Sequence, residues 1–374
     1  MALPRVAAFT DTYLPTVNGV TYTVKTWREQ WAQRDARMDV VYPRSDHRAT
    51  AGEHPVTSLP FPFYDGFRVG VPRIPSAIST VDIVHAHTPF SLGLAAKRFA
   101  RKRDAPLVAS YHTPTSEYAS YLSVNGSIED LIGDTATRYE RWFLDHVDMV
   151  ITPSEQTATH LESAVGVETP VEVLPNGVDT DFFAPTETAA FRERYDLPDG
   201  PLVGYTGRHG YEKNLDNIIR AADGLDVTLV FGGDGPARDD LARLAEEADV
   251  DVRFLGFVDR SELPALYATL DVFAFPSPVE TQGLVALEAN ACGTPVVGVD
   301  AGALSNTIDD GERGYTYPPG DIDAFRERIQ HTLEEYETLR ATCLARRDRI
   351  SVEHSVDRLA DIYAQVSCTG GRTQ

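Results

Sequence analysis

Cysteine is scarce in this sequence of 374 residues, and long apolar runs are missing. The three cysteines, Cys292, Cys343 and Cys368, are too few and too widely spaced for a disulfide framework or a metal cluster, which indicates reduced thiols in a cytosol. No apolar run approaches the ~18 residues that span a bilayer, and the N-terminus has no basic lead followed by a long apolar stretch. The sequence therefore predicts a cytoplasmic protein.

Positive charge is also scarce, since 34 basic residues stand against 56 acidic ones, for a net charge of −22, and only four of the basic residues are lysine. A protein that binds nucleic acid needs a basic surface patch, so no nucleic-acid partner is expected. A carboxylate-rich surface keeps a protein hydrated in a high-salt cytoplasm, which favours a halophilic source. An acidic enzyme from an ordinary cytoplasm is the alternative.

Two series of short apolar segments alternate with helical patterns along the chain. Such alternation is typical of α/β proteins with doubly wound parallel sheets, and the length suits two domains. The expected strands are Arg5–Phe9, Asp39–Tyr42, Ile83–Ala86, Pro106–Tyr111, Asp148–Thr152 and Val171–Leu174 in the first series, and Leu202–Tyr205, Val227–Phe231, Val252–Leu255, Val272–Phe275 and Val296–Val299 in the second.

The rhythm breaks near residue 185, in a stretch rich in Pro and Thr. The predicted domains are a Rossmann-like N-terminal domain over residues 1–185 and a Rossmann-like C-terminal domain over residues 186–350. Residues 351–374 are expected to form a helix and tail that pack back on the first domain. Ligands of open α/β sheets bind at the carboxyl ends of the strands, which predicts a cleft between two facing domains.

Two cations follow the first strand of the second series. Arg208 and Lys213 lie after Leu202–Tyr205, where an Arg can grip diphosphate oxygens bidentately and a Lys can act as a point charge. The alternative is an exposed basic pair at a helix start. Cations are disfavoured at the N-terminus of a helix, which favours a functional role.

A second segment, from Pro276 to Pro295, carries two carboxylates and a glycine before a helix. Backbone amides of Gly283, Leu284 and Val285 are expected to form an anion site at the positive end of that helix. Glu280 and Glu288 would lie ~12 Å apart on a continuous helix, farther than the ~5–9.5 Å of a glycosidase pair. They are therefore interpreted as hydroxyl acceptors for two different sugars, one near the reacting carbon and one on a ribose.

Taken in order, these segments resemble the family 4 glycosyltransferases of GT-B fold, and the similarity runs over nearly the whole chain. It implies a retaining enzyme that moves a hexosyl group from a UDP- or GDP-linked sugar to an acceptor, without a cofactor or a bound metal. It also implies that the N-terminal domain binds the acceptor and the C-terminal domain binds the nucleotide sugar. Further segments that carry the resemblance are Thr10–Val20, His85–Phe90, Tyr111–Pro114, Pro175–Asp179, Phe231–Pro236 and Phe254–Phe257.

The resemblance also implies a role for each matching residue. Arg208 and Lys213 would neutralise the donor diphosphate, and Gly19 lies in a loop where a missing side chain lets the backbone approach the phosphates. Glu288 would hold the ribose hydroxyls, and the base would be bound near Phe257.

The two residues implied as catalytic are His112 and Glu280. His112 would lie beside the donor sugar, bind a hydroxyl and support the positive charge that builds on the anomeric carbon, while Glu280 would contact the sugar. His85 and His87 have no acidic or Cys partner nearby, so they are interpreted as structural and no metal site is predicted.

The acceptor is expected to be a membrane lipid or a polyprenyl-linked glycan, because the segments Tyr111–Tyr121 and Glu280–Gly283 look closest to the lipid-glycosylating branch. This branch comprises diacylglycerol glucosyltransferases, sulfoquinovosyltransferases and phosphatidylinositol mannosyltransferases. A basic cluster could dock on anionic headgroups at the inner face of the membrane. Alternatively, its cations complement a helix C-terminus. The cluster consists of Lys97, Arg98, Arg101, Lys102 and Arg103.

Other functions stay open at this stage. They are a soluble GT-B enzyme acting on a small sugar or capsule acceptor, a sugar-nucleotide epimerase, and a non-catalytic partner that binds nucleotide. The loop Gly302–Asn306 departs from the family pattern on the donor-sugar side, which leaves the sugar open. A dinucleotide dehydrogenase is disfavoured because no Gly-x-Gly-x-x-Gly follows a first strand.

Overall fold

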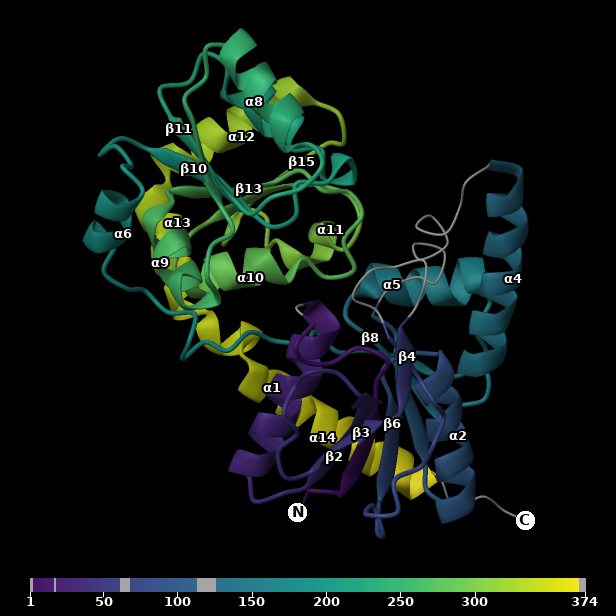
Figure 1. Cartoon of the computed structure of the whole chain (residues 1–374). Coiled ribbons are helices and arrows are strands. Elements are labelled where there is room, and N and C mark those ends of the chain that lie inside the picture. The colour runs from purple at the N-terminus through teal and green to yellow at the C-terminus, as the bar shows by residue number, and fades with distance from the viewer. Residues whose placement is uncertain (1–2, 17, 61–67, 113–125, 370–374) are drawn as a thin grey trace. The chain divides into compact units, whose positions relative to one another are not determined.

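The computed structural model describes residues 3–16, 18–60, 68–112 and 126–369, and it contains two compact α/β units (Figure 1). Unit 1 runs to Asn176 and resumes at Ser355, and unit 2 is Gly177–His354. This boundary lies before the expected residue 185. The reason is that the amide of Val178 donates to the carbonyl of Ile350 at 2.8 Å and Phe183 is buried in the core of unit 2.

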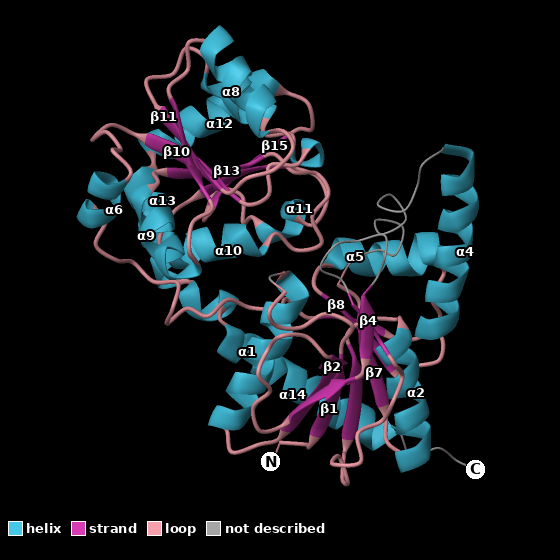
Figure 2. Ribbon diagram, viewed as in Figure 1, coloured by secondary structure: helices cyan, strands magenta, loops and turns pink. Residues whose placement is uncertain are grey.

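Unit 1 is built on a seven-stranded parallel sheet of order β3-β2-β1-β6-β7-β8-β9, with helices packed beside it (Figure 2). Its strands are β1 (Val6–Phe9), β2 (Met38–Pro43), β3 (Glu53–Val56), β6 (Ile83–Ala86), β7 (Leu107–Ser110), β8 (Met149–Thr152) and β9 (Val171–Val173), with a separate hairpin of β4 (Ser58–Pro60) and β5 (Arg68–Gly70). Its helices are α1 (Gly19–Gln33), α2 (Ser91–Arg103), α4 (Gly126–Leu144), α5 (Glu155–His160) and most of α14 (Val352–Thr369).

Unit 2 is built on a six-stranded parallel sheet of order β12-β11-β10-β13-β14-β15. Its strands are β10 (Leu202–Thr206), β11 (Thr228–Gly232), β12 (Val252–Gly256), β13 (Val272–Phe275), β14 (Val296–Val299) and β15 (Gly314–Tyr317). Its helices are α6 (Ala189–Arg194), α7 (Asp216–Ala222), α8 (Arg238–Glu247), α9 (Leu263–Thr269), α10 (Leu284–Ala291), α11 (Leu304–Thr307), α12 (Ile322–Glu334) and α13 (Tyr336–Ala345).

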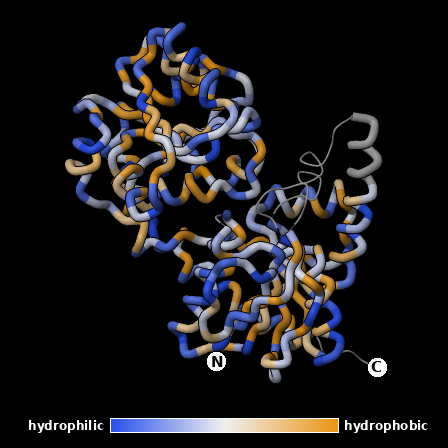
Figure 3. The backbone as a smooth tube through the Cα atoms, in the orientation of Figure 1, coloured by the Kyte–Doolittle hydropathy of each residue, from blue (hydrophilic) through white to orange (hydrophobic). Residues whose placement is uncertain are grey.

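The central strands are apolar and buried along their whole length, which explains why they read as continuous hydrophobic segments. All four residues of β1, β6 and β13 are buried, and Figure 3 shows hydrophobic colours along the strands of both units. A strand covered by helices on both faces needs this pattern. The predicted doubly wound parallel sheets are confirmed.

Four strands, β3, β4, β5 and β15, were missed by the sequence analysis because they lack such a run. β3 pairs with β2 although two of its four residues are Glu53 and His54, and β4 and β5 have only three residues each. β15 begins at Gly314, whose Cα approaches the backbone of Val296 so closely that a methyl group would overlap it. Their positions follow from pairing with neighbouring strands rather than from local hydrophobicity.

Helix α14 begins at the end of unit 2 and packs on unit 1 (Figure 1). The Tyr363 ring lies 5.6 Å from the Trp31 ring of α1, and the Tyr363 hydroxyl is 2.6 Å from Nδ1 of His85 in β6. An ion pair of 3.1 Å joins Arg34 and Asp357. The last helix therefore closes the core of the first unit.

In each sheet the order in which the chain adds strands reverses at one point, and in open α/β sheets such a point is where ligands bind. In unit 1 the chain goes from β1 outward to β2 and β3, and then returns to β6 on the other side of β1; in unit 2 the same reversal lies between β10 and β13. The loops that leave the carboxyl ends of these strand pairs flank a crevice in open α/β sheets. Most of the predicted site residues lie in these loops and in the elements that follow them, whereas His112 follows β7 and Phe257 follows β12.

Candidate active site

The loops after β10 and β11 in unit 2 meet backbone to backbone. Gly207 and Gly233 have φ angles of 147° and 108°, and a methyl group on Gly233 would overlap the carbonyl of Gly207. The amide of Gly207 donates to Gly232 O at 3.1 Å, and that of Gly233 donates to Gly256 O at 2.7 Å. Only glycine permits both these angles and this approach. The loop that carries Arg208 is thereby held against the ends of β11 and β12.

Both cations of this loop are paired with carboxylates. Lys213 ends a short 3-10 turn, and its Nζ lies 2.7 Å from Oε1 of Glu280, which is 67 residues away in the loop after β13. Both side chains are only about one-fifth exposed, at 20% and 18%. Arg208 lies 3.3 Å from Glu212 and is more than half exposed. Strand order brings Lys213 and Glu280 together, because β13 lies next to β10.

The expected anion site lies at the start of α10. Gly283 has a φ angle of 77° and precedes Leu284, the first residue of the helix, while Glu280 lies in the loop before it. The first amides of a helix have no intrahelical acceptor and point outward at the positive end of the dipole. The amides of Leu284 and Val285 therefore point out of the N-terminal end of α10, where the loop that carries Glu280 joins the helix.

Glu288 lies one turn farther along α10 and has a specific partner. The Tyr267 hydroxyl of α9 donates to Glu288 Oε2 at 2.7 Å. Burial raises the pKa of the Glu288 carboxyl to about 7, although the Tyr267 hydrogen bond and the charge of Arg260 act in the opposite direction. Phe257, directly after β12, is 82% exposed. It is available for contact with a flat ligand surface.

In unit 1, Gly19 is the first residue of α1 and is exposed. The preceding Asn18 caps the helix, because its side-chain oxygen accepts from the backbone amide of Thr21 at 2.9 Å. The side-chain nitrogen of Asn18 donates to the Thr12 hydroxyl at 2.9 Å. These two bonds fix the entry of the chain into α1, at the carboxyl end of β1.

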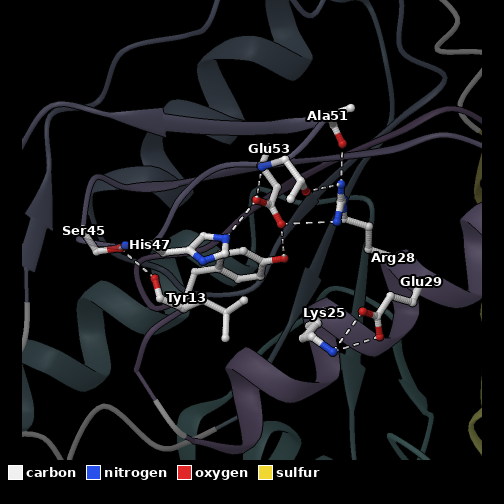
Figure 4. A network of polar contacts seen from close by, with 10 residues as sticks. Tyr13, Lys25, Arg28, Glu29, Ser45, His47, Ala51 and Glu53 are labelled. Carbon is white, nitrogen blue, oxygen red and sulfur yellow. Dashed lines mark hydrogen bonds and ion pairs between the residues drawn. The ribbon is translucent and has the colours of Figure 1, made fainter.

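A buried carboxylate anchors the same loop (Figure 4). Glu53 of β3 accepts from the Tyr13 hydroxyl at 3.1 Å and from the Thr50 amide at 2.8 Å, and lies within 3.3 Å of Arg28 and 3.0 Å of His47. Burial by itself would raise the pKa of Glu53, but the bonds from Thr50 and His47 and the charge of Arg28 hold it below its usual value. The loop after β1 is thus fastened to the loop after β2.

Three histidines form a stack at the carboxyl ends of β6 and β7. The rings of His85 and His87 lie 4.1 Å apart, and those of His87 and His112 lie 5.4 Å apart and nearly parallel. His87 Nδ1 is 3.1 Å from His112 Nε2. Burial lowers the pKa of His112 to about 4 and that of His85 to about 3, so all three rings are neutral near pH 7.

The basic cluster lies along α2, with its members in different surroundings. Lys97 packs its ammonium 4.1 Å from the ring centre of Trp142 in α4, and Arg103 donates to the carbonyl of Ile78 at 2.9 Å. Arg98, Arg101 and Lys102 are exposed. The last turn of the helix holds three of the five cations, so both the surface role and the dipole role remain consistent with this geometry.

Two family models match the chain in succession. The model described as Glycosyltransferase Family 4 matches residues 17–182, and the model described as Glycosyl transferases group 1 matches residues 187–345. The chain is 31% identical over 336 residues to the alpha-monoglucosyldiacylglycerol synthase of Streptococcus pneumoniae, with 84% of this chain and 75% of that protein covered. The chain belongs to glycosyltransferase family 4.

Other relatives of this family 4 glycosyltransferase differ in their named acceptors. The 2-deoxystreptamine glucosyltransferase of Streptomyces kanamyceticus is 30% identical over 295 residues, with 75% of this chain and 76% of that protein covered. Among solved structures, sucrose-phosphate synthase from Thermosynechococcus elongatus superposes with a TM-score of 0.78 at 21% identity, covering 98% of this chain and 100% of that one. The predicted GT-B fold and the enzyme class are confirmed.

The structure brings together some of the predicted residues of this glycosyltransferase and adds others. Lys213 and Glu280 are in contact, and the amides of Gly283, Leu284 and Val285 follow Glu280 within the same segment. Arg208 contacts Glu212 instead, and no contact within unit 2 joins Glu288 to Lys213 among the described residues. The roles that the family pattern gives to these residues stay predictions.

Sequence reasoning missed the partners of two predicted residues, Tyr267 beside Glu288 and His87 beside His112. The spacing of His85 and His87 indicated that these two side chains share a face of the sheet, because residues i and i+2 of a strand point the same way, but it gave no signal for His112. The segment from residue 113 to Tyr121, which supported the lipid-glycosylating branch, lies outside the described residues.

The described residues contain neither a helix that could span a bilayer nor a group of side chains that could hold a metal ion. Among residues 3–16, 18–60, 68–112 and 126–369, no helix is both long and apolar enough to cross a membrane. Within the same ranges, no three His, Cys, Asp or Glu side chains are grouped to hold a metal ion. The halophilic source and the metal-free reaction both stay predictions.

The raised pKa of Glu288 predicts a pH-dependent stability. Between pH 4.5 and 7 the folded protein keeps a proton on Glu288 that the unfolded chain releases, so this carboxyl lowers the free energy of unfolding as the pH rises. Glu288→Gln keeps an oxygen for the Tyr267 hydroxyl and carries no charge. We expect the free energy of unfolding of this variant to match that of the wild type at pH 5 and to exceed it by on the order of 2 kcal/mol at pH 8.

Urea unfolding at both pH values measures this difference. Glu246→Gln, at an exposed position of α8, provides the matched control and should show no pH-dependent gain. An equal gain at pH 5 and pH 8 for Glu288→Gln would mean that Glu288 is already ionised in the folded protein at pH 5.

Proposed function

We propose that this enzyme transfers a hexosyl group from a UDP- or GDP-linked sugar to a membrane lipid, with retention of the anomeric configuration and without a metal ion. The lipid is a glycerolipid-type core or a polyprenyl-linked glycan. The observation that carries the proposal is the Lys213–Glu280 ion pair beside the start of α10. A cation, a carboxylate and helix amides in one place match a diphosphate that is bonded to a sugar.

The ion pair supports an exchange of partners when the donor binds. Without donor, Glu280 neutralises Lys213 at 2.7 Å. A diphosphate carries more charge than one carboxylate and competes for the ammonium, which leaves Glu280 to accept a hydrogen bond from a sugar hydroxyl. Fixed positive charge then stabilises the nucleoside diphosphate as it departs, a task that a metal ion performs in other enzymes.

The surface of unit 1 supports a lipid acceptor. Leu94 of α2 and Trp142 of α4 are 39% and 44% exposed, and Arg98 and Arg101 are exposed on α2 with Leu94 at i, i+4 and i+7 spacing. Apolar side chains among cations suit the interface of an anionic bilayer. The Streptococcus pneumoniae relative is named as an alpha-monoglucosyldiacylglycerol synthase. The proposed location of this enzyme is the cytoplasmic face of the cell membrane.

A transfer assay tests the proposal directly. The purified full chain is incubated with a panel of UDP- and GDP-sugars, with and without a lipid extract, and the products are identified by mass spectrometry. We expect release of nucleoside diphosphate that depends on lipid, a glycolipid whose anomeric linkage matches the donor, and a rate within twofold in EDTA.

Each alternative gives a different result in this assay. A product with soluble sugars only would identify a small-acceptor enzyme, and an isomerised sugar without any acceptor would identify an epimerase. Nucleotide binding with no turnover for any donor would identify a non-catalytic partner. Loss of activity in EDTA that Mg²⁺ restores would contradict the metal-free reaction.

Membrane docking makes a separate prediction for Arg98, Arg101 and Lys102. Changing all three to glutamine should weaken flotation with phosphatidylglycerol vesicles about 100-fold at low ionic strength, because each basic residue contributes about 1 kcal/mol near such a surface. Lys97 and Arg103 are left in place because they contact Trp142 and Ile78.

The matched control changes three exposed arginines of unit 2, Arg194, Arg220 and Arg243, to glutamine and alters the net charge equally. We expect this triple variant to keep vesicle binding within threefold. Equal losses in the two triple variants would show a general charge effect and would contradict docking through α2.

A further inference from the structure

We infer that His87 is a positioning residue that holds His112 in one tautomer, with its proton on Nδ1. The inference rests on the proposed function and on the role that the family resemblance implies for His112, which is contact with the donor sugar. It starts from the contact of 3.1 Å between His87 Nδ1 and His112 Nε2, both inside unit 1. His112 is partly exposed and turns Nε2 toward His87, so with respect to the described residues Nδ1 is the nitrogen that remains for a ligand.

The first step is that His87 cannot rotate away. Its ring is stacked on that of His85 at 4.1 Å, the nearly parallel His112 ring lies 5.4 Å away, and the Trp27 ring lies 5.8 Å from it. The backbone amide of His87 donates to Phe9 O at 2.8 Å, which ties this residue to the end of β1. Packing against these rings fixes the ring plane and therefore the direction of Nδ1.

His85 is itself held from both sides. Its Nδ1 is 2.6 Å from the Tyr363 hydroxyl of α14, and its Nε2 is 2.8 Å from the Ser110 hydroxyl of β7. Hydroxyl groups can donate or accept, so they satisfy His85 in either tautomer. The direction of the proton between His87 and His112 must therefore be decided at His87.

The deciding observation is the other nitrogen of His87. Nε2 is buried, and among the described residues it has no hydrogen-bond partner. A neutral imidazole carries one N–H and one bare nitrogen. If His112 donated to His87, the N–H of His87 would lie at Nε2 and would be a buried donor without an acceptor, which native structures avoid most strongly. The proton of His87 therefore lies on Nδ1 and is donated to His112 Nε2.

The consequence for His112 follows from the same rule. Because its Nε2 accepts from His87, its single proton lies on Nδ1, and the ring offers a neutral N–H to a sugar hydroxyl. The other tautomer would offer only a lone pair. A neutral ring also avoids placing a fixed positive charge beside an anomeric carbon that is itself becoming positive.

Two substitutions at His87 test the inference. His87→Asn keeps an amide near the position of Nδ1 and can still donate to His112, whereas His87→Leu keeps bulk and removes the donor. We expect kcat to fall about tenfold in His87→Leu, by the loss of one buried hydrogen bond, with KM for the donor changed less than threefold, and kcat to stay within threefold in His87→Asn.

The spectroscopic readout is the tautomer of His112, observed by long-range ¹H–¹⁵N correlation in histidine-labelled protein. We expect the protonated nitrogen to be Nδ1 in the wild type and in His87→Asn, and a mixture in His87→Leu. Tyr363→Phe is the matched control, since it removes one hydrogen bond from the same stack without touching the His87–His112 contact. It should leave the His112 tautomer unchanged.

Two results would overturn the inference. One is a wild-type His112 protonated on Nε2. The other is an equal loss of kcat in His87→Asn and His87→Leu with an unchanged tautomer, which would assign His87 a purely structural role. The tautomer is measured without any substrate, so an enzyme that fails to transfer sugar would refute the proposed function and leave this test intact.

Discussion

Alanine in place of Lys213 is expected to lower kcat/KM for the donor by a factor on the order of 10²–10³. A charge-assisted hydrogen bond to a diphosphate contributes about 1.5–3 kcal/mol, and each 1.4 kcal/mol is about tenfold in rate. The variant also leaves Glu280, only 18% exposed, without its partner at 2.7 Å. An uncompensated carboxylate at the place where a diphosphate must bind adds repulsion to the loss of attraction.

Steady-state kinetics and calorimetric titration with the nucleoside diphosphate measure the two parts of this effect. Lys25→Ala is the matched control, because Lys25 also forms an ion pair, at 2.9 Å with Glu29, but on the surface of α1 (Figure 4). Its kcat/KM should stay within threefold of the wild type. Wild-type kinetics in Lys213→Ala, or equal losses in both variants, would remove Lys213 from the donor site.

Removing both members of the pair separates attraction from repulsion. Lys213→Ala/Glu280→Ala should bind the nucleoside diphosphate at least threefold more tightly than Lys213→Ala, because the unpaired carboxylate is gone. Its turnover should not recover, since the proposed contact to the sugar is lost as well. Neighbouring charges of this kind are coupled, so the double variant is not expected to equal the sum of the single ones.

Alanine in place of Gly233 is expected to destabilise unit 2 by about 4 kcal/mol and to abolish measurable donor binding. Its φ angle of 108° is unfavourable for any residue with a Cβ, and the added methyl group would overlap the carbonyl of Gly207. The backbone at Gly207 must then move, and Arg208 moves with it. Folding and binding are therefore coupled at this glycine.

Urea unfolding followed by two probes measures this prediction. All three tryptophans, Trp27, Trp31 and Trp142, belong to unit 1, so their fluorescence reports on that unit, while circular dichroism reports on both. We expect Gly233→Ala to lower the urea midpoint observed by circular dichroism more than the midpoint observed by fluorescence.

Gly224→Ala is the matched control for strain without a clash. Gly224 has a φ angle of 81°, but a methyl group there would have no atom within 4 Å. In this variant the free energy of unfolding should fall by about 1 kcal/mol, and donor binding should be unchanged. Equal stability losses at Gly233 and Gly224 would mean that the backbone contact with Gly207 is not a constraint.

Local sequence patterns predicted the parts of the molecule whose formation depends on neighbours in the chain. The strands of the two central sheets were predicted because each is an apolar run that helices cover on both faces. The turn at Gly283 and the start of α10 followed from a strand, a loop and a helix in succession. Strands β3 and β15 were missed, because pairing with β2 and β14 stabilises them more than their own composition does.

The partners of the site residues could not be predicted in the same way. Lys213 meets Glu280 across 67 residues, and His85 meets Tyr363 across 278. Such contacts depend on the order of strands in the sheet and on the return of α14 to unit 1, which no local pattern encodes. Families preserve site residues as motifs, but a motif does not name the atom that each side chain contacts.

The sequence by itself determined the α/β class, the glycosyltransferase family and the set of residues on which a donor site can be built, because hydrophobic periodicity and strand–loop–helix motifs are properties of short segments. Only the tertiary structure decided the charge partner of Lys213, the raised pKa of Glu288 and the neighbour of His112. The physical reason is that pairing, burial and proton position depend on groups far apart in the chain, which the packing of sheet and helix brings within a few ångströms.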